Sequence, residues 1–234
     1  METIPLGRLA IAFLPVAVVI GLLWHWKLNY HAALVAVGRM LLQLLLIGYA
    51  LVFLFEAQNG LVILGALSIM LLAASSIALG NLGASFRSLF PKSLFAIGLG
   101  GGTVLLIITQ GVLGLDPWFD PSIIIPLAGM IFATSMNSVS LAGERLESEI
   151  GQGLSFAPAR SVAMRAALIP ITNSLLAVGL VSLPGMMTGQ ILSGVSPFIA
   201  ARYQIMVMCM IFGAAGLSAA LFLTIARKEL EREP

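Results

Sequence analysis

Polar side chains recur at helical spacing inside one strongly apolar stretch of the chain. This stripe consists of Met130, Thr134, Asn137, Leu141 and Glu144. Steps of four, three, four and three place its members on one face of a helix. A face with three polar members is not expected to contact lipid, because uncompensated polar groups are costly in hydrocarbon. The stripe therefore predicts either a seam of hydrogen bonds between helices or one wall of a translocation path.

An apolar run further along the chain is interrupted by residues that disfavour regular helix. Residues 180–197 read LVSLPGMMTGQILSGVSP, with Pro184 and Gly185 at the interruption. In hydrocarbon, an irregular backbone survives only where protein covers it or where it faces a water-filled cavity. The break therefore predicts a path or a gate. Met186 and Met187 lie within it, and their thioethers could contact a soft metal ion.

These considerations give a set of candidate residues for a translocation path or substrate site. The set is Gln43, Thr134, Asn137, Asn173, Met186, Met187 and Gln190. Hydrogen bonding between helices is the alternative for the asparagines, and packing is the alternative for the methionines. Three methionines of the last apolar run, Met206, Met208 and Met210, alternate along the chain. On a helix they point in different directions, so we expect them to pack and not to converge on one ion.

Composition places the chain in a membrane. Of its 234 residues, 59% are hydrophobic and 9% are charged, and the mean hydropathy is +1.06. A soluble domain of this length needs far more charge to cover its surface. The single cysteine, Cys209, lies in an apolar run, so no internal disulfide can form and we expect a small buried side chain.

The predicted fold class is all-α, a polytopic membrane helix bundle with about seven transmembrane spans. Seven apolar stretches approach the length of about 20 residues that a helix needs to cross a bilayer. They cover residues 9–26, 32–55, 61–80, 94–114, 122–142, 166–192 and 199–226. The sixth stretch is interrupted near its end by the Pro-Gly break. Residues 1–234 are expected to form a single transmembrane domain.

Positive charges in the connections predict the orientation of the bundle. One side collects Lys27, Arg87, Lys92, Arg145, Arg160, Arg165, Arg227, Lys228 and Arg232. The other side holds Arg8 and Arg202 together with Glu56, Asp116 and Asp120. This imbalance places the carboxyl terminus in the cytoplasm and the amino terminus outside. No basic leader with a small-residue cleavage site is evident, so the first span is expected to remain.

Two charged regions require partners. Arg39 lies four residues before Gln43 in the second span, and an arginine there is expensive unless it is paired or hydrated. We expect Glu144, at the same depth, to be its counter-charge; the alternative is that Arg39 snorkels to cytoplasmic headgroups.

Residues 143–165 form the only long charged connection between spans. The members expected to contact a cytoplasmic partner are Arg145, Glu147, Glu149, Arg160 and Arg165. Pro158 is expected to divide this connection into short helical stretches, and a solvated loop is the alternative to a docking element.

Several familiar motifs are absent or explained by packing. Gly98 and Gly102 lie four residues apart, and Gly216 and Ala220 repeat this small-residue spacing, which is typical of close helix contacts. No GK[ST] follows the glycine run, so nucleotide binding by this chain is not expected. Two histidines near one interface and no HExxH sequence argue against an intramembrane protease, so we do not expect an enzyme.

Three segments carry a resemblance to a known family. They read ERL after the fifth span, AALIPITNS in the sixth, and GLVSLPGMMTGQILSGVSPFIAARYQI around the break. They resemble the FetB-like iron-export permeases of ABC transporters, a family that also includes aluminium-resistance membrane proteins of plants. The resemblance covers most of the chain, with weaker support from GRMLLQLLLIGYAL in the second span. It implies a permease subunit that forms a homodimer in a bacterial cytoplasmic (inner) membrane and exports metal ions such as iron.

The resemblance also implies a partner that supplies energy. Without a Walker A loop in this chain, ATP and Mg²⁺ would be bound by a separate cytoplasmic ABC ATPase, and no cofactor is expected here. Closure of the ATPases would push on residues 143–165 and re-aim the broken segment. Membrane lipid is an expected partner and nucleic acid is not.

Two alternatives remain at this stage: an ATP-independent cation carrier or channel, and ABC export of a non-metal substrate such as a sugar nucleotide or lipid. The acidic residues cluster at span ends, which argues mildly against a proton-coupled carrier.

Overall fold

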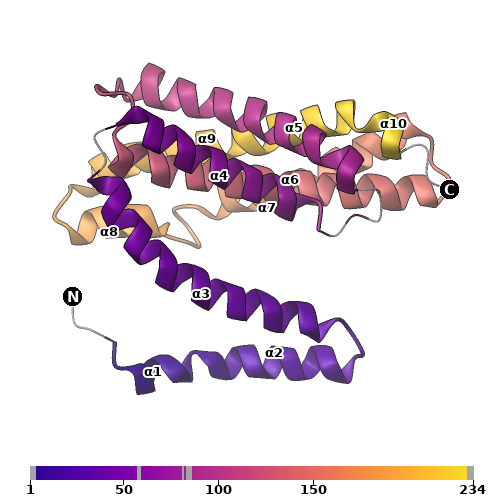
Figure 1. The fold of residues 1–234 in the computed structure, drawn as a ribbon, viewed down its shortest axis with the longest axis horizontal. Coiled ribbons are helices and arrows are strands. Elements are labelled where there is room, and N and C mark those ends of the chain that lie inside the picture. Colours follow the sequence, from indigo (N-terminus) through magenta and orange to yellow (C-terminus); the bar gives the residue numbers. More distant parts are fainter. Residues whose placement is uncertain (1–3, 57–58, 81, 83–85, 231–234) are drawn as a thin grey trace. The chain divides into compact units, whose positions relative to one another are not determined.

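The computed structural model describes residues 4–56, 59–80, 82 and 86–230, nearly all of them in helices. The predicted all-α fold class is confirmed. The chain divides into two compact units, Met1–Glu56 and Ala57–Pro234, which are coloured indigo to purple and purple to yellow in Figure 1.

The amino-terminal unit contains α1 (Leu6–Ile11), α2 (Phe13–His25) and α3 (Tyr30–Phe55). Helix α2 packs against α3. The turn between them is set by Lys27, whose backbone is left-handed with φ 59°, and by Asn29. The Asn29 side-chain oxygen accepts a hydrogen bond from the Ala32 N–H at 3.2 Å and so caps α3. Neither α2 nor α3 contains a buried residue.

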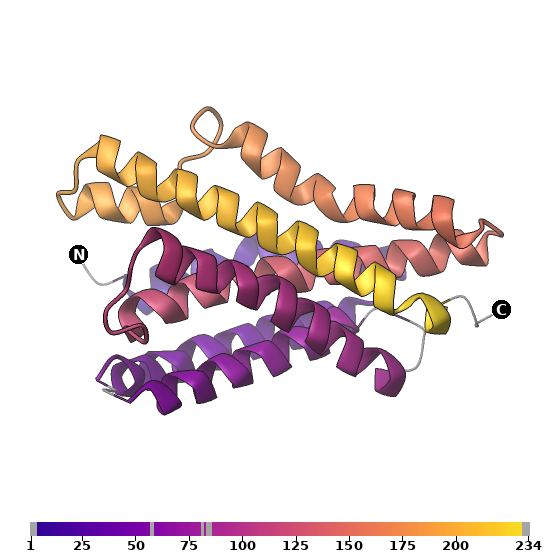
Figure 2. The ribbon, with the colours of Figure 1, turned by 90° about the horizontal axis from the view of Figure 1, so that it is seen from above.

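The carboxy-terminal unit contains five long helices and three short elements among its described residues. They are α4 (Gly60–Ala78), α5 (Phe86–Leu106), the π-helix η1 (Ile107–Val112), α6 (Pro121–Gly151), α7 (Phe156–Ala177), α8 (Gly185–Leu192), α9 (Pro197–Ile225) and α10 (Arg227–Leu230). Helix α6 packs against α4, α5, α7 and α9, and α9 also packs against α5, α7 and α8. Figure 2 shows α7 and α9 running along the bundle on the side of α6 away from α4.

Small residues allow the helices of this unit to approach closely. A Cβ atom at Gly100 of α5 would lie 2.8 Å from the Ser218 backbone nitrogen of α9. A Cβ atom at Gly101 would lie 2.8 Å from Ile131 of α6. Real Cβ atoms do not approach other atoms so closely, so α5 fits between its neighbours because these two positions are glycine.

The predicted small-residue pairs are only partly correct. Gly98 does lie against a neighbour, since its Cβ atom would be 3.2 Å from Leu71. Gly102 and Gly216 would have no such atom within 4 Å, so they are not sites of close approach. Of these predicted glycines, only Gly98 is therefore a site of close approach. The expectation for Cys209 is also wrong, because its side chain is exposed.

A buried hydrogen-bond seam joins α6 to α9. The Ser218 hydroxyl donates to the Ser135 hydroxyl at 3.0 Å, and Ser135 donates to the Ala214 carbonyl at 3.3 Å. Both serines are fully buried. The seam lies one residue away from Thr134, so the predicted polar stripe is not the seam.

Among the described residues, six helices are long and apolar enough to cross a bilayer. They are Gly7–His25, Tyr30–Phe55, Gly60–Ala78, Phe86–Val112, Pro121–Gly151 and Pro197–Ile225. These correspond to the first five predicted spans and the last. The predicted sixth span is instead divided between α7 and α8. Helix α7 has 22 residues, which is about 33 Å of helix, but Arg160 and Arg165 lie in its first half. Seven crossings and the orientation remain predictions.

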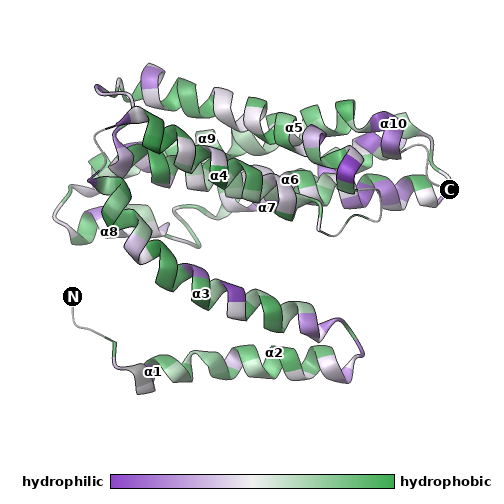
Figure 3. Ribbon diagram, in the orientation of Figure 1, coloured by the Kyte–Doolittle hydropathy of each residue, from purple (hydrophilic) through white to green (hydrophobic). Residues whose placement is uncertain are grey.

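Residues 143–165 form a helical hairpin and not the predicted mixture of loop and short helices. Helix α6 continues to Gly151 and α7 begins at Phe156, because the sequence GERLESEIG is rich in helix-favouring residues. Gly153, with φ +92°, makes the turn. Pro158 does not divide a helix; it lies in the first turn of α7, where no backbone N–H is needed. Figure 3 shows hydrophilic residues gathered where α6 and α10 end.

Candidate translocation site

The predicted break is present, and its backbone forms a compact turn. Helix α7 ends at Ala177, whose carbonyl accepts hydrogen bonds from the N–H groups of Val181 at 2.8 Å and Ser182 at 3.2 Å. The Gly179 N–H donates to the Ser182 carbonyl at 2.9 Å, and Gly179 has φ +82°. The turn thus satisfies several of its own polar groups. The interruption begins at Val178, before the proline that signalled it.

A cavity of about 320 Å³ lies beside this break, between α6, α7, α8 and α9. We call it the methionine cavity. Its lining consists of Met130, Ser174, Val178, Ser182, Pro184, Gly185, Met186, Gln204, Val207, Met208 and Ile211.

A second cavity of about 220 Å³ follows along α6 and α7. We call it the asparagine cavity. Its lining consists of Thr134, Asn137, Ser138, Leu141, Ala167, Pro170, Ile171, Ser174 and Ile211. The two cavities share Ser174 and Ile211, so they adjoin.

The polar stripe of α6 therefore faces cavities. Met130 lines the methionine cavity, and Thr134, Asn137 and Leu141 line the asparagine cavity. At a rise of about 1.5 Å per residue, the stripe from Met130 to Leu141 extends about 16 Å. This is about half of the hydrocarbon thickness of about 30 Å.

Two hydroxyl groups line these walls and donate within their own helices. The Thr134 hydroxyl donates to the Met130 carbonyl at 2.8 Å, and the Ser174 hydroxyl donates to the Pro170 carbonyl at 3.0 Å. A hydroxyl oxygen that donates its proton can still accept. These side chains are therefore suited to contact a cation or a water molecule.

Gln204 is a polar residue of the site that the sequence analysis missed. It is 6% exposed and lines the methionine cavity, and its side-chain carbonyl oxygen has no hydrogen-bond partner within the described part of the chain. An unsatisfied buried acceptor costs about 1–3 kcal/mol. The sequence could have identified it, because Gln204 lies inside the last predicted apolar run, as Asn173 lies inside the sixth.

The structure gathers some of the predicted site residues and separates others. Thr134, Asn137 and Met186 line the two adjoining cavities. Asn173 is exposed and lines neither cavity, although the next residue, Ser174, lines both. The half-buried residues Met187 and Gln190 line neither cavity.

The remaining predicted residues belong to different units. Gln43 and Arg39 are exposed side chains of α3 in the amino-terminal unit, and Glu144 is an exposed side chain of α6. The pairing of Arg39 with Glu144 stays a prediction, as does any part for Gln43 in a path.

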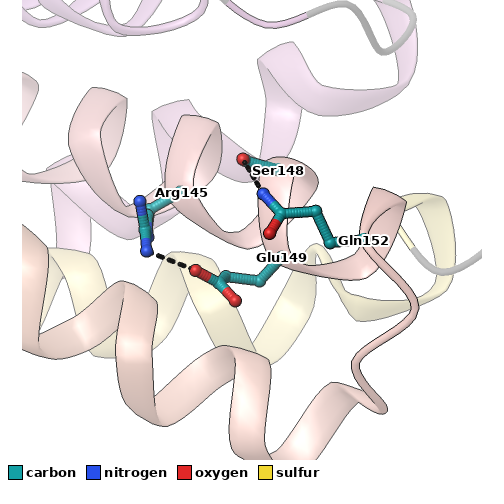
Figure 4. A network of polar contacts seen from close by, with 4 residues as sticks. All are labelled: Arg145, Ser148, Glu149 and Gln152. Atoms are coloured by element: carbon teal, nitrogen blue, oxygen red, sulfur yellow. Dashed lines mark hydrogen bonds and ion pairs between the residues drawn. The ribbon is translucent and has the colours of Figure 1, made fainter.

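The end of α6 carries a polar network that includes one predicted coupling residue in an unexpected role. Arg145 forms an ion pair with Glu149 one turn later, and the Gln152 amide donates to the Ser148 hydroxyl at 3.2 Å (Figure 4). Glu149 is only 7% exposed. Its carboxylate is thus paired inside its own helix and is not presented to a partner, whereas Arg145 and Arg160 are exposed.

Helix α10 is tied to the same end of the unit. The Arg227 guanidinium carbon lies 4.7 Å from the centre of the Phe156 ring at the start of α7, and Glu229 forms an ion pair with Lys92 of α5. A third cavity, of about 520 Å³, lies between α7 and α9 here, and Arg160 and Arg165 line it.

Together these features define a polytopic helical membrane protein in which a broken helix segment borders the methionine cavity, and this cavity adjoins the asparagine cavity. The chain belongs to the family described as "Uncharacterised protein family (UPF0014)", which matches residues 6–230. It is an integral membrane protein of that family.

The relatives include bacterial and plant proteins. A UPF0014 membrane protein of Synechocystis is 40% identical over 208 residues, 81% of this chain and 80% of its own. The "Probable iron export permease protein FetB" of Escherichia coli is 36% identical over 90% of this chain and 86% of its own. The "Protein ALUMINUM SENSITIVE 3" of Arabidopsis thaliana is 33% identical over 79% of this chain and 71% of its own. The family resemblance predicted from the sequence is confirmed. No solved structure matches the chain.

Proposed function

We propose that this protein is the permease subunit of an ABC-type exporter that moves metal ions out across a bacterial inner membrane. The relative named as a probable iron export permease supports this proposal, because its similarity extends over 90% of the chain and so includes both units. The subunit itself performs no chemistry in this scheme. ATP and Mg²⁺ bind to a separate ATPase, and two permease copies assemble with it.

The observation that carries the proposal is the continuity of α7 between the two ends of the unit. This helix runs without interruption from the charged hairpin at Phe156 to Ser174, which lines both cavities. Helix α6 does the same, from Met130 in the methionine cavity to Gly151. Continuous helices move as rigid bodies, and the part of α7 before Pro170 already reaches the asparagine cavity at Ala167, so a push on the hairpin would reach that cavity directly.

The hairpin also has the reach that coupling needs. Helix α6 has 31 residues, about 46 Å of helix, which is longer than the hydrocarbon thickness of about 30 Å. Its charged end, with Arg145 and Glu147, would therefore stand outside the hydrocarbon beside Arg160. We propose that Arg145, Glu147, Arg160 and Arg165 contact the ATPase, and that Glu149 instead stabilises the hairpin.

Pro170 provides the place where α7 could bend. A proline inside a helix removes one backbone hydrogen bond and favours a kink. Pro170 lines the asparagine cavity. A change of this kink would alter the width of that cavity while the hairpin moves as one body.

The test is substrate-stimulated ATP hydrolysis. The chain would be purified together with a cytoplasmic ABC ATPase from the same organism and reconstituted in lipid vesicles. We expect ATP hydrolysis to increase several-fold when metal ions are added, and metal transport to require ATP. Changing Glu147 and Arg160 together to Ala should abolish the stimulation. Changing Arg8 and Glu56 together to Ala, an exposed arginine and an exposed glutamate of the amino-terminal unit, serves as the matched control.

The alternatives give different results. Transport that continues without any ATPase would show a cation carrier or channel. ATP hydrolysis stimulated by sugar nucleotides or lipids, and not by metals, would show a non-metal cargo.

A further inference from the structure

Methionines from three different helices meet at one cavity. Met130 of α6, Met186 of α8 and Met208 of α9 all line the methionine cavity. The sequence analysis assigned Met208 to packing because it alternates with Met206 and Met210 along the chain. That reasoning is correct within α9, since neither Met206 nor Met210 lines this cavity. The three methionines that line this cavity come instead from three different helices.

The same cavity holds a buried acceptor that lacks a partner. The carbonyl oxygen of the Gln204 side chain has no hydrogen bond within the described residues, and the residue is 6% exposed. Gln204 and Met208 lie four residues apart on α9, so they share one face of that helix. A buried acceptor without a protein donor is stabilised by a bound water molecule or by a cation.

The donor atoms select the kind of ion. Thioether sulfur is a soft ligand and favours Cu(I) and similar ions, whereas Mg²⁺, Ca²⁺ and Mn²⁺ prefer carboxylate and carbonyl oxygen. Within residues 4–56, 59–80, 82 and 86–230, no group of three or more His, Cys, Asp or Glu side chains could hold a metal ion. The ligands expected for a hard or borderline divalent ion are therefore not grouped in this part of the chain.

We propose that the methionine cavity binds a soft monovalent metal cation, Cu(I) or Ag(I), through Met130, Met186 and Met208, with the Gln204 carbonyl oxygen beside it. Thioethers are neutral and hold such an ion without strong charge attraction, which suits a cargo that has to be released. That this ion is the transported cargo rests on the proposed export function. That the cavity binds the ion does not depend on that function. Because Met186 belongs to α8, the site is complete only when the broken segment is folded against α6 and α9.

Packing is the competing explanation, because methionine fills irregular gaps in apolar cores. The two explanations separate under substitution by leucine. Leucine conserves volume and so preserves packing, but it provides no sulfur. Loss of ion binding with retained stability is therefore expected only if the thioethers are ligands.

The experiment uses the full chain, purified in detergent without ATP or any partner. All variants carry Cys209→Ser, because the exposed thiol would bind the same ions. Cu(I) affinity is measured by competition with a chromogenic Cu(I) chelator under reducing conditions. The test variant combines M130L, M186L and M208L. The matched control combines M70L, M164L and M206L, three half-buried methionines outside this cavity.

We expect about one Cu(I) per chain, at least a tenfold loss of affinity in the test variant, and no change in the control. A hundredfold excess of Mg²⁺ or Mn²⁺ should not displace the ion. The inference is overturned if the parent chain binds no Cu(I), if both triple variants lose affinity equally, or if the hard cations compete. If the triple variant fails to fold, M186L alone decides, because its half-buried side chain lies on the short helix α8.

Gln204→Leu tests the amide separately, with a several-fold loss of affinity expected; unchanged affinity would remove Gln204 from the site. Since no ATPase is present, failure of ATP coupling would leave the binding result intact. If the chain binds no Cu(I), the proposed exporter carries a different cargo.

Discussion

In the amino-terminal unit, α2 and α3 bury no residue at all, whereas in the carboxy-terminal unit α6 alone buries thirteen. The unburied helices are nevertheless among the most apolar of the chain, as the nearly continuous green of α2 in Figure 3 shows. In a membrane, lipid is as apolar as leucine, so a leucine gains little by leaving lipid for a protein contact. Apolar content thus predicts membrane insertion but does not predict burial.

Small and hydroxylated side chains distinguish the unit that packs. Gly100 and Gly101 permit close helix approach, Ser135 and Ser218 form a hydrogen bond between α6 and α9, and the methionine and asparagine cavities lie in the same unit. We therefore expect the same type of substitution to change the free energy of unfolding more in the carboxy-terminal unit than in the amino-terminal unit.

The largest difference should come from leucine truncation. Leu146 of α6 is 0% exposed, while Leu45 of α3 is 70% exposed. Leu146→Ala should lower the free energy of unfolding by about 2–5 kcal/mol, because it leaves a cavity in packed protein. Leu45→Ala should change it little, because lipid fills the space. Unfolding in mixed detergent micelles measures both, and a comparable loss at Leu45 would show that α3 is buried in the working assembly.

Glycine substitution should give the next largest difference, within a single helix. Gly100→Ala forces a methyl group against the Ser218 backbone and should cost about 1–3 kcal/mol. Gly102→Ala meets no neighbouring atom within 4 Å and should stabilise α5 by up to about 1 kcal/mol through helix propensity. Thermal unfolding in detergent distinguishes them; effects of the same sign would mean that Gly100 is not a site of close approach.

Replacing Arg145 at the hairpin should lower the free energy of unfolding, because it leaves a buried charge unpaired. Arg145→Ala leaves the Glu149 carboxylate without its ion-pair partner, and we expect a loss of about 1–3 kcal/mol in the free energy of unfolding. Arg145→Lys keeps the charge and should lose less. If both variants unfold like the parent chain, the pair does not stabilise the hairpin and Glu149 is free to serve the ATPase.

The smallest effect should come from the serine seam. Ser135→Ala removes the acceptor of Ser218 and should cost about 1 kcal/mol, since hydrogen bonds between membrane helices are individually weak. Ser68→Ala removes a hydroxyl that bonds only within α4 and should have almost no effect. Equal unfolding midpoints for the two variants would show that the seam does not contribute to the packing of α6 on α9.

Much of the fold follows from local sequence patterns. The apolar runs predicted seven spans, and six of these match helices of the described residues that are long and apolar enough to cross a membrane. The stripe from Met130 to Leu141 predicted one helix face, and that face lines cavities. The Pro-Gly pair predicted the interruption, although the helix already ends at Ala177. Helical periodicity and backbone restrictions act over a few residues, so a single sequence carries them.

The predictions that failed depend on which helix lies beside which. Gly102 was predicted as a site of close approach, whereas the closest contacts of α5 are at Gly100 and Gly101, because the point of closest approach depends on the neighbouring helix. The burial of Glu149, which was expected to contact a cytoplasmic partner, likewise depends on neighbouring helices. The expectation that Met208 packs stays a prediction, since its place in the methionine cavity fits packing and ion binding alike.

The sequence by itself determined that this protein inserts in a membrane, where its helices run, and which helix face is polar, because each of these depends on residues within a few turns of one another. Tertiary structure decided that Met130, Met186, Met208 and Gln204 share one cavity. Those residues lie up to 78 positions apart in the sequence, and only the packing of α6, α8 and α9 brings them together. Packing between membrane helices depends on complementary shape and on a few hydrogen bonds, and neither produces a periodic pattern in the sequence.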